Sequence, residues 1–528
     1  MSASLLAILV VSVLVAAVTR RHDLSAPLVL VVVGLTIGML PDIEYVVDVA
    51  LDPEVVLYVV LPPLLWTAGL TSSSVSMRAN KRPIALLAVA LPLLTTAVVG
   101  YVAYRTVPEM TLAAAFVLGA IVAPPDAVSA GAIGRRLGLP RRTMTLISGE
   151  SLLNDATALT AYKVALAAAI GASTGVSKGL VTFVMAVVGG VVVGFVLGKT
   201  LVYIRSHLDD PTAESAIGLV APFLVYLVAE QIGGSGVLAV VIAALIAAQR
   251  FSRAGYAVRL QDDAVWRAVQ LVLESFAFLL IGLQLPTAVD ELSGLSAAEI
   301  VVASVSVLGS VILVRLVWVF PFAYVPRLLS AKIRASEPPP DPRQLLIIAW
   351  AGMRGVVSLA AAFAVPLTTL SGDGFPGRPQ IIFLTFIVVV GTLLLHGLTL
   401  PWLIRRLDVQ GDQERLDAMA AAAAQEKAAR AAGQLLDQLL ADHSAELDEQ
   451  TAEVLRSWNN RRQWSAWERV ADRTAESPIA AFRELRLQML AVERSAFLTE
   501  RDVGNIDDEV LSKLLHGIDL EEAMLTRG

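Results

Sequence analysis

The stretch GESLLNDATALTAYK, residues 149–163, carries two acids inside a segment that otherwise has the character of a membrane-spanning helix. Ionisable side chains are costly in lipid, so within a spanning segment they face protein or water and indicate a pathway or a relay. Successive residues of a helix advance by about 100° around its axis. Four polar residues therefore share one face of this helix: Glu150, Ser151, Asn154 and Asp155.

This polar face combines carboxylate, amide and hydroxyl oxygens, which are hard ligands suited to a small alkali cation. One of its acids can also carry a proton when no cation is bound. The alternative is a polar contact that only joins two helices. The clustering of four oxygen-bearing side chains favours the ion site over this structural interpretation.

The composition of the whole chain is typical of a polytopic membrane protein. Of its 528 residues, 56% are hydrophobic and 17% are charged, and the mean hydropathy is +0.69. The chain has no cysteine, which excludes disulfides, thiolate nucleophiles and metal sites built from cysteine. About 20 apolar residues cross a bilayer, and we predict thirteen crossings. The windows lie at 4–18, 25–40, 54–70, 84–104, 111–130, 148–170, 177–204, 214–232, 235–250, 268–285, 299–323, 345–368 and 380–404.

Basic residues are concentrated in alternate loops between these windows. Loops such as 41–54 and 290–294 have none, and the positive-inside rule places the basic loops in the cytoplasm. We therefore expect a plasma-membrane protein with its N-terminus outside and its C-terminus in the cytoplasm. The first window lacks a small-residue cleavage site, so we expect it to be retained. The basic loops carry Arg20 and Arg21; Arg78, Lys81 and Arg82; Arg135, Arg136, Arg141 and Arg142; Arg250, Arg253, Arg259 and Arg267; and Arg327, Lys332, Arg334 and Arg343.

The last part of the chain, residues 408–528, differs from the apolar part, residues 1–407. It contains 24 acids against 14 Lys and Arg, which gives a net charge of about −10. Stretches such as LDAMAAAAAQEKAARAAGQLLDQLL have strong helix propensity, and later pieces have apolar residues at helical spacing. We expect a transmembrane domain over 1–407 and a cytosolic helical tail over 408–528 that serves regulation or dimerisation. A ligand-binding sensor is the alternative for the tail.

Two other spans contain features that break a helix at membrane depth. In GAIVAPPDAVSAGAIG, two prolines remove backbone donors and free carbonyl groups beside Asp126. In AWAGMRGVVSLAAAFAVP, two glycines flank Arg354. Broken helices hold ions in many transporters, although a simple proline kink is the alternative for the first. A buried guanidinium needs a carboxylate partner, and Glu150 and Asp155 are both candidates.

Five further ionisable residues lie in or beside the spans, and we interpret them as structural because Lys and Arg extend to the interface and single histidines are generally satisfied by packing. Glu274 and Arg315 lie on neighbouring spans and can pair with each other. Lys163 lies two turns beyond the acids of the polar face, within reach of the cytosolic side or of a third carboxylate. The five residues are Glu274, Arg315, Lys163, Glu230 and His396.

Four motifs together resemble those of the monovalent cation/proton antiporters, in the branch of the NhaP-type bacterial proteins and the animal sodium/proton exchangers. They are GESLLND at 149–155, PDAV at 125–128, LPPLLW at 61–66 and GMRG at 352–355. The resemblance covers about residues 5–405. It implies an all-α membrane protein, usually a homodimer, with thirteen helices in inverted repeats. Two broken helices, here the fifth and twelfth spans, would cross at mid-membrane.

The resemblance also implies roles for individual residues. Asp155 would be the carboxylate that binds either the cation, Na⁺, or the proton, and Asn154 and Ser151 would assist it. A backbone carbonyl near Pro125 would contribute a further oxygen. Asp126 would cap or neutralise the ends of the broken helices.

On the same pattern, Glu150 and Arg354 would form a structural ion pair that leaves the other acid free to exchange. Two departures from the family pattern bear on ion selectivity. Pro125 stands where many relatives have a threonine, so no side-chain hydroxyl is available there. Thr67 stands where relatives often carry an acid.

Antiport follows from competition, because one carboxylate holds either a cation or a proton and each occupied form lets the site face the other side. The resemblance implies one proton per cation where an asparagine, Asn154, precedes Asp155. We therefore expect electroneutral Na⁺/H⁺ exchange by alternating access, for sodium extrusion and pH homeostasis, with K⁺ as the alternative cation. We expect no cofactor beyond the transported ions and no nucleic-acid partner.

Other functions remain as rival hypotheses. A cation channel would conduct without proton counterflow, and a membrane receptor would keep the polar cluster as a vestigial or sensing site. An intramembrane aspartyl protease needs two paired aspartates, and its expected Gly-any-Gly-Asp motif does not occur at Asp126 or Asp155. We therefore expect a transporter and not an enzyme.

Overall fold

The chain forms two compact units, Met1–Gln410 and Gly411–Gly528. Regular structure within the described ranges is helical, and Thr368 and Gly374 form an isolated bridge. The prediction of an all-α protein is therefore confirmed. The computed structural model describes residues 3–22, 26–40, 56–171, 176–251, 254–290, 292, 296–336, 339–409, 413–441, 450–460, 478–503 and 505–527.

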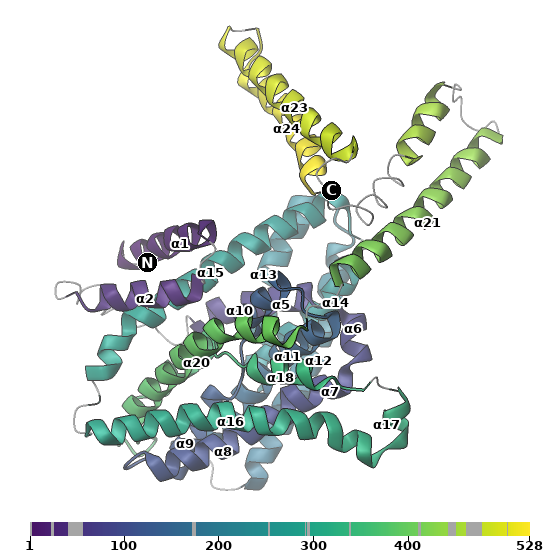
Figure 1. Ribbon diagram of the computed structural model, residues 1–528. Helices are drawn as coiled ribbons and strands as arrows, with labels where there is room; N and C mark the ends of the chain where they lie inside the picture. Colours follow the sequence, from purple (N-terminus) through teal and green to yellow (C-terminus); the bar gives the residue numbers. More distant parts are fainter. Residues whose placement is uncertain are drawn as a thin grey trace. The chain divides into compact units, whose positions relative to one another are not determined.

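The first unit is a bundle of long and short helices (Figure 1). The elements η1 and η2 are single π-helical turns that lead directly into α-helices. The bounds are α1 Ala3–Arg21, α2 Ala26–Gly38, η1 Val56–Val60, α5 Leu61–Thr71, α6 Ser74–Ala79, α7 Lys81–Ala85, η2 Leu86–Ala90, α8 Leu91–Thr106, α9 Leu112–Val122, α10 Ala127–Arg136, α11 Arg141–Ala169, α12 Val176–Arg205, α13 Pro211–Gln231, α14 Gly236–Phe251, α15 Tyr256–Asp290, α16 Ala297–Leu329, α17 Ala331–Ser336, α18 Pro342–Trp350, α19 Val356–Phe363 and α20 Arg378–Leu407.

The lengths and compositions of these helices are those of a multi-pass membrane protein. In its described part, each of the thirteen predicted windows falls on helix, and the windows at 111–130 and 345–368 each fall on two half-helices. Thirteen remains a predicted number of crossings. Six described helices are long and apolar enough to cross a bilayer: Lys81–Thr106, Val181–Arg205, Pro211–Gln231, Tyr256–Pro286, Ala297–Leu329 and Arg378–Leu407. Four apolar helices are shorter: Ala26–Gly38, Tyr58–Thr71, Leu112–Val122 and Gly236–Phe251.

Local sequence signals explain where the two interrupted helices begin. Thr111 precedes α9, and its hydroxyl accepts a hydrogen bond from the backbone N–H of Ala114 at 3.2 Å. Asp341 precedes α18, and its carboxylate accepts one from the backbone N–H of Arg343 at 2.9 Å. Such N-caps satisfy donors that a helix start leaves unpaired. Both helices therefore start at a residue that the sequence specifies locally.

α11, the helix that carries the polar face, contributes to two hydrophobic clusters. One cluster includes side chains of α8, α9, α16, α18 and α20 together with Leu146 and Ile147 of α11. The other includes side chains of α5, α12, α13 and α14 together with Leu152 and Ala156 of α11. Because α11 packs into both clusters, its polar side chains must find their partners inside the protein.

The backbones of α2 and α15 approach each other closely where these two helices of the first cluster cross. Gly34 of α2 and Gly282 of α15 face each other, and a methyl group added to Gly282 would lie 2.9 Å from the Cα of Gly34. Small residues at helix crossings bring backbones near enough for extensive van der Waals contact, which is a main source of helix association in lipid. A larger residue at either position would separate α2 from α15.

The second unit consists of paired helices: α21 Gln413–Ala441, a helical segment at 450–460, α23 Pro478–Asp502 and α24 Asp508–Arg527. Arg456 of the segment at 450–460 forms an ion pair of 2.9 Å with Asp437 of α21. α23 and α24 are joined by ion pairs, among them Arg486 with Glu521 at 2.7 Å. The described part of this tail is helical, as predicted, and the role of the tail stays a prediction.

Candidate ion-binding site

The fifth and twelfth predicted spans are broken helices. The first break separates α9, which ends at Val122, from α10, which begins at Ala127. The second separates α18, which ends at Trp350, from α19, which begins at Val356. Two consecutive prolines remove the backbone donors that would continue α9. The prediction of two broken helices is confirmed.

The two breaks are in direct contact. The backbone N–H of Asp126 donates a hydrogen bond to the carbonyl of Met353 at 2.6 Å. A methyl group added to Gly355 would lie 2.5 Å from Oδ2 of Asp126, which is closer than non-bonded atoms approach. Gly355 therefore provides the space in which the two interrupted chains meet.

Asp126 lies where two half-helices begin. It directly precedes α10, and its side chain lies against Gly355, the N-cap residue of α19. The N-terminus of a helix carries a partial positive charge, which a nearby carboxylate stabilises. This position fits the capping role expected for Asp126, although the role itself stays a prediction.

Arg354 is fully buried and binds the opposite end of a half-helix. Its Nε donates to the carbonyl of Val122, the last residue of α9, at 3.1 Å, and its Nη1 donates to the carbonyl of Gly352. Its backbone N–H donates to Oγ1 of Thr392 at 3.0 Å. The last carbonyls of a helix are unpaired and partly negative, so the guanidinium compensates the charge at the end of α9.

Arg315 of α16 compensates the negative charge at the end of α18, as Arg354 does for α9. It also binds the carboxylate of Glu150. Its Nη2 donates to Oε2 of Glu150 at 2.8 Å, and its Nη1 donates to Oε1 of the same carboxylate. Nη2 also donates to the carbonyl of Ile348 at 2.9 Å, and Nε to that of Ala349 at 3.1 Å. Glu150 and Arg315 are 1% and 3% exposed, so this two-pronged pair is shielded from water.

The structure corrects the predicted ion pairs. Glu150 pairs with Arg315, so the predicted pair of Glu150 with Arg354 is wrong. The alternative pairing of Arg315 with Glu274 is also wrong, because Glu274 instead accepts a hydrogen bond from Gln270 at 2.6 Å. The reason is packing: α16 lies against α18, which brings Arg315 to the end of α18 and to Glu150 together. The donors of Arg354 are directed at the carbonyls beside the two breaks.

Asn154 connects α11 to the first break. Its Nδ2 donates to the carbonyl of Pro125 at 2.8 Å, and that carbonyl lies in the interval between α9 and α10. Its Oδ1 is buried and has no hydrogen-bond partner in the part of the chain that the structure describes. An unpaired buried oxygen is unusual, and a bound cation is one partner that would satisfy it. The carbonyl of Pro125 keeps a second lone pair that can contribute as well.

Asp155 is the residue after Asn154 on α11, and its environment differs from that of Glu150. It is 9% exposed, and among the described residues no hydrogen bond or ion pair is found to its carboxylate. The carboxyl group of Asp126 acts on it electrostatically. Ser151, one turn earlier, is half-buried and interacts within the protein. Asp155 and Asn154 together thus present unpaired oxygen atoms beside the first break.

The remaining ionisable candidates have structural partners. Nζ of Lys163 contacts Oε2 of Glu230 at 2.6 Å, so Lys163 does reach a third carboxylate. Oε1 of Glu230 also accepts a hydrogen bond from the backbone N–H of Gly236 at 3.0 Å, at the start of α14. The ring of His396 packs against that of Trp350, with centroids 4.9 Å apart. Three helices, α11, α13 and α14, meet at the Lys163–Glu230 pair.

Two polar groups of the site were missed in the sequence. Thr392 of α20 holds the backbone of the second break, and Ser358 of α19 has a buried hydroxyl without a partner among the described residues. The residue type alone identifies neither of them, because single hydroxyl residues are common in apolar helices and generally hydrogen-bond to their own backbone. Ser358 follows the second break by three residues, and that closeness is the signal that could have found it.

Known proteins match this arrangement. The family described as "Sodium/hydrogen exchanger, transmembrane" matches residues 6–406. An uncharacterized Na⁺/H⁺ exchanger of Mycobacterium tuberculosis is 32% identical over 540 residues, which cover 98% of this chain and 96% of the relative. A sodium, potassium, lithium and rubidium/H⁺ antiporter of Bacillus pumilus is 30% identical over 398 residues, which cover 73% of this chain and 59% of the relative. The similarity to the first relative extends into the tail.

A solved structure has the same fold. The sodium proton antiporter MjNhaP1 of Methanocaldococcus jannaschii superposes with a TM-score of 0.60 at 20% identity. The match covers 76% of this chain and 97% of the other. At this level of identity the likeness concerns the fold alone.

Proposed function

This chain belongs to the sodium/hydrogen exchanger family, and from that premise we propose that it exchanges Na⁺ for H⁺ in a one-to-one ratio. Asp155 is the shared carboxylate, which holds either the cation or the proton. The contrast on α11 carries the proposal: the carboxylate of Glu150 is engaged at both oxygens by Arg315, whereas that of Asp155 has no such partner in the described chain.

The oxygen atoms around Asp155 support cation binding. Asn154 offers a buried unpaired Oδ1, the carbonyl of Pro125 offers a lone pair, and Ser151 lies one turn away on the same helix. Carboxylate, amide and carbonyl oxygens are the ligands that hard cations prefer. Asp126 remains at the start of the half-helices, where it balances their positive ends.

The charge count supports the one-to-one ratio. One carboxylate releases one proton when one monovalent cation binds, and the neighbouring Asn154 is neutral at all physiological pH values. Each loaded form then carries the same net charge through the membrane. The exchange is electroneutral, and its direction follows the larger of the two ion gradients.

The choice of Na⁺ over K⁺ rests on the family name and on the small number of side-chain ligands. The Bacillus pumilus relative bears a name that includes both ions, so K⁺ is the second candidate. This chain departs from the family pattern at two positions, Pro125 and Thr67. Both departures affect the choice between Na⁺ and K⁺. Thr67 donates its hydroxyl to the carbonyl of Leu64 at 2.8 Å, which engages it within its own helix.

The cellular setting follows from the same premise. We place the protein in the plasma membrane as a homodimer, with its N-terminus outside, and assign it to sodium extrusion and pH homeostasis. The acidic tail, residues 408–528, lies in the cytoplasm and regulates transport or strengthens the dimer. Transport proceeds by alternating access, in which each loaded form of the site faces either side in turn.

A flux experiment tests the proposal. The purified full chain is placed in vesicles with a preset pH gradient, and Na⁺ or K⁺ is added while internal pH is followed. Wild type should collapse the gradient, and Asp155→Asn should reduce the rate to that of empty vesicles because the shared carboxylate is gone. A valinomycin clamp that leaves the rate unchanged supports electroneutral exchange.

The matched control is Glu274→Gln, which removes a half-buried acid from another spanning helix, one that already accepts a hydrogen bond from Gln270. It should keep exchange. Cation flux without proton movement would favour the channel hypothesis. Wild type that moves no protons in response to Na⁺ or K⁺ would favour the receptor hypothesis and overturn the proposal.

A further inference from the structure

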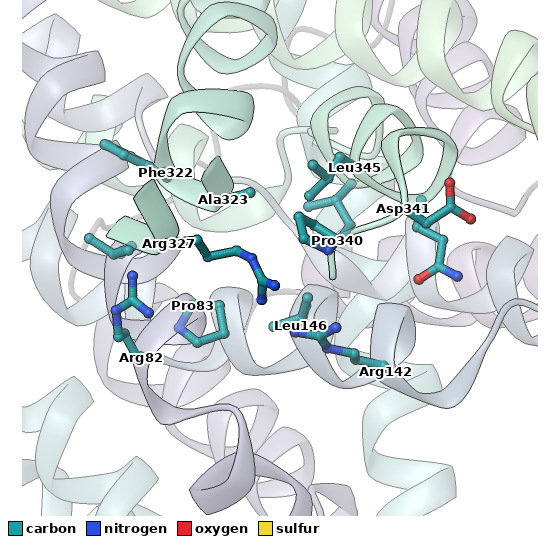
Figure 2. A pocket seen from close by; sticks show the side chains of 13 residues that line it. Arg82, Pro83, Arg142, Leu146, Phe322, Ala323, Arg327, Pro340, Asp341 and Leu345 are labelled. Atoms are coloured by element: carbon teal, nitrogen blue, oxygen red, sulfur yellow. The ribbon is translucent and has the colours of Figure 1, made fainter. Parts of the chain in front are cut away.

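A separate cavity opens among five elements of the first unit (Figure 2). The space between its lining residues, open solvent included, is about 550 Å³. Its walls come from α7 with η2, from α11, from α16 and from α18 with the two residues before it. None of the proposed ion ligands lines it, so its chemistry needs a separate explanation.

Three arginines from three different helices border this cavity. Arg82 comes from α7, Arg142 from the first turn of α11 and Arg327 from the last turn of α16. Figure 2 shows their guanidinium groups around one opening. All three side chains are half-buried. Nε of Arg142 donates to Oδ1 of Asn80 over a long 3.4 Å, which uses one of its five N–H donors.

The charge of the cavity lining is positive. Among the described residues that line it, Asp341 is the single acid, and its carboxylate caps α18 through the backbone N–H of Arg343. Arg82 and Arg327 each make another interaction within the protein, so a ligand would share them with existing partners. Apolar side chains such as Phe322 form much of the remaining wall, and they strengthen electrostatic attraction by excluding water.

We propose that this cavity binds a phosphate group, presented either by an anionic lipid headgroup or by a soluble phosphorylated compound. A guanidinium is a planar fork that matches two phosphate oxygens, and three forks around one opening suit a tetrahedral anion. Basic pockets between spanning helices on the cytoplasmic side are typical headgroup sites. Leu328 and Leu329, which follow Arg327, are 75% and 83% exposed, as expected beside acyl chains.

The cavity is connected to the frame of the ion site. Leu146 lines it and lies one helical turn before Glu150 on α11. Ile348 also lines it, and the carbonyl of Ile348 accepts a hydrogen bond from Arg315. A phosphate group held by the arginines would therefore join α7, α11 and α16, and the Glu150–Arg315 pair also joins two of these helices, α11 and α16. Binding stabilises the folded first unit by mass action and leaves Asp155 unchanged.

The test measures the melting temperature of the purified full chain in detergent. Three ligands are added separately: phosphatidylglycerol, phosphatidylcholine and inorganic phosphate. The pocket variant combines Arg82→Gln, Arg142→Gln and Arg327→Gln. The control variant combines Arg78→Gln, Lys332→Gln and Arg334→Gln, which remove the same charge from exposed positions in two of the three basic loops that hold the pocket arginines.

Wild type and the control variant should melt several degrees higher with phosphatidylglycerol or with inorganic phosphate, and phosphatidylcholine should have no effect. The pocket variant should lose the shift, and its apparent Kd should rise by at least about tenfold because charge-assisted hydrogen bonds are lost. A response to the lipid alone identifies a headgroup site, and a response to inorganic phosphate alone identifies a soluble ligand.

Two results would overturn the proposal: no stabilisation of wild type by either anion, or an equal shift in the pocket variant. If the pocket variant does not fold, the single variant Arg142→Lys is measured instead. It keeps the charge and loses the planar fork, so it should weaken the shift in part. An unchanged shift in Arg142→Lys and in the other two single lysine variants would again contradict a guanidinium site.

Discussion

The two acids of α11 have opposite environments although they lie only five residues apart. Glu150 is 1% exposed and both of its oxygens contact Arg315, whereas Asp155 is 9% exposed and its carboxylate has no such partner in the described chain. Both residues are carboxylic acids, and both lie on α11. The difference teaches that function here depends on which acid the surrounding helices leave unpaired.

A second comparison, between the two half-helices that end at the breaks, explains why both arginines are needed. Arg354 binds the last carbonyl of α9, and Arg315 binds carbonyls at the end of α18. Each broken helix thus has its own buried cation at its negative end. Arg315 differs because it also holds Glu150, so its loss would release an acid as well as a helix end.

The largest expected effect comes from breaking the Glu150–Arg315 pair. Glu150→Gln should lower the free energy of unfolding by about 3–5 kcal/mol, because it leaves a buried guanidinium without its counter-charge. We expect poor expression and a much lower melting temperature. The double variant Glu150→Gln with Arg315→Gln should recover part of the loss, since neither charge is then left alone.

The melting temperatures of the single and double variants measure the interaction between Glu150 and Arg315. Asp155→Asn serves as the matched comparison on the same helix, and it should keep the wild-type melting temperature while losing exchange. If Glu150→Gln is stable but does not exchange, and Asp155→Asn still exchanges, the assignment of the two acids is reversed.

The next effect concerns the contact between the two breaks. Gly355→Ala would place a methyl group 2.5 Å from Oδ2 of Asp126, so the two chains must separate. We expect a loss of about 1–3 kcal/mol in stability, as for overpacked cores, and a severe loss of exchange. Gly374→Ala is the control, because a methyl group there meets no atom within 4 Å. Equal exchange rates for both variants would contradict a tight crossing.

A smaller effect is expected from the Lys163–Glu230 pair. The side chain of Lys163 is 47% exposed, and half-exposed ion pairs contribute about 0.2–1 kcal/mol. Lys163→Gln should therefore lower the melting temperature slightly and leave exchange within about twofold. Glu230→Ala should be more harmful, because it also removes the acceptor of the Gly236 N–H. Complete loss of exchange in Lys163→Gln would instead assign Lys163 to the proton pathway.

The smallest effect concerns the tail and depends on pH. Hydrogen bonds from Arg486 hold the pKa of Glu521 below its usual range. A depressed pKa in the folded state stabilises the α23–α24 hairpin above the unfolded pKa, and this contribution is lost as pH falls through the folded value. A peptide of residues 478–527 should lose helical circular dichroism as the pH falls below about 4.5, the ordinary pKa of a glutamate.

Arg486→Gln is the control for this pH dependence. It removes the partner of Glu521, so its helical signal should be lower at neutral pH and should change less on acidification. Superimposable pH curves for the two peptides would show that the Arg486–Glu521 pair does not stabilise the hairpin.

Much of the architecture is determined by the sequence alone, because its signals are local. Long apolar windows specify spanning helices, consecutive prolines before Asp126 remove backbone donors, and the spacing of Glu150, Asn154 and Asp155 puts them close together on α11. These features depend on neighbouring residues and on helical geometry. For that reason the breaks and the helical content agree with expectation.

Only the tertiary structure decided which charges meet. Arg315 and Arg354 are both arginines in apolar spans, and nothing in their local sequence tells which of them reaches Glu150. The packing of α16 against α18 settles the question by placing Arg315 at a carboxylate 165 positions away in the chain. Pairing is governed by through-space distance in a low dielectric, and helix packing sets that distance independently of the local pattern.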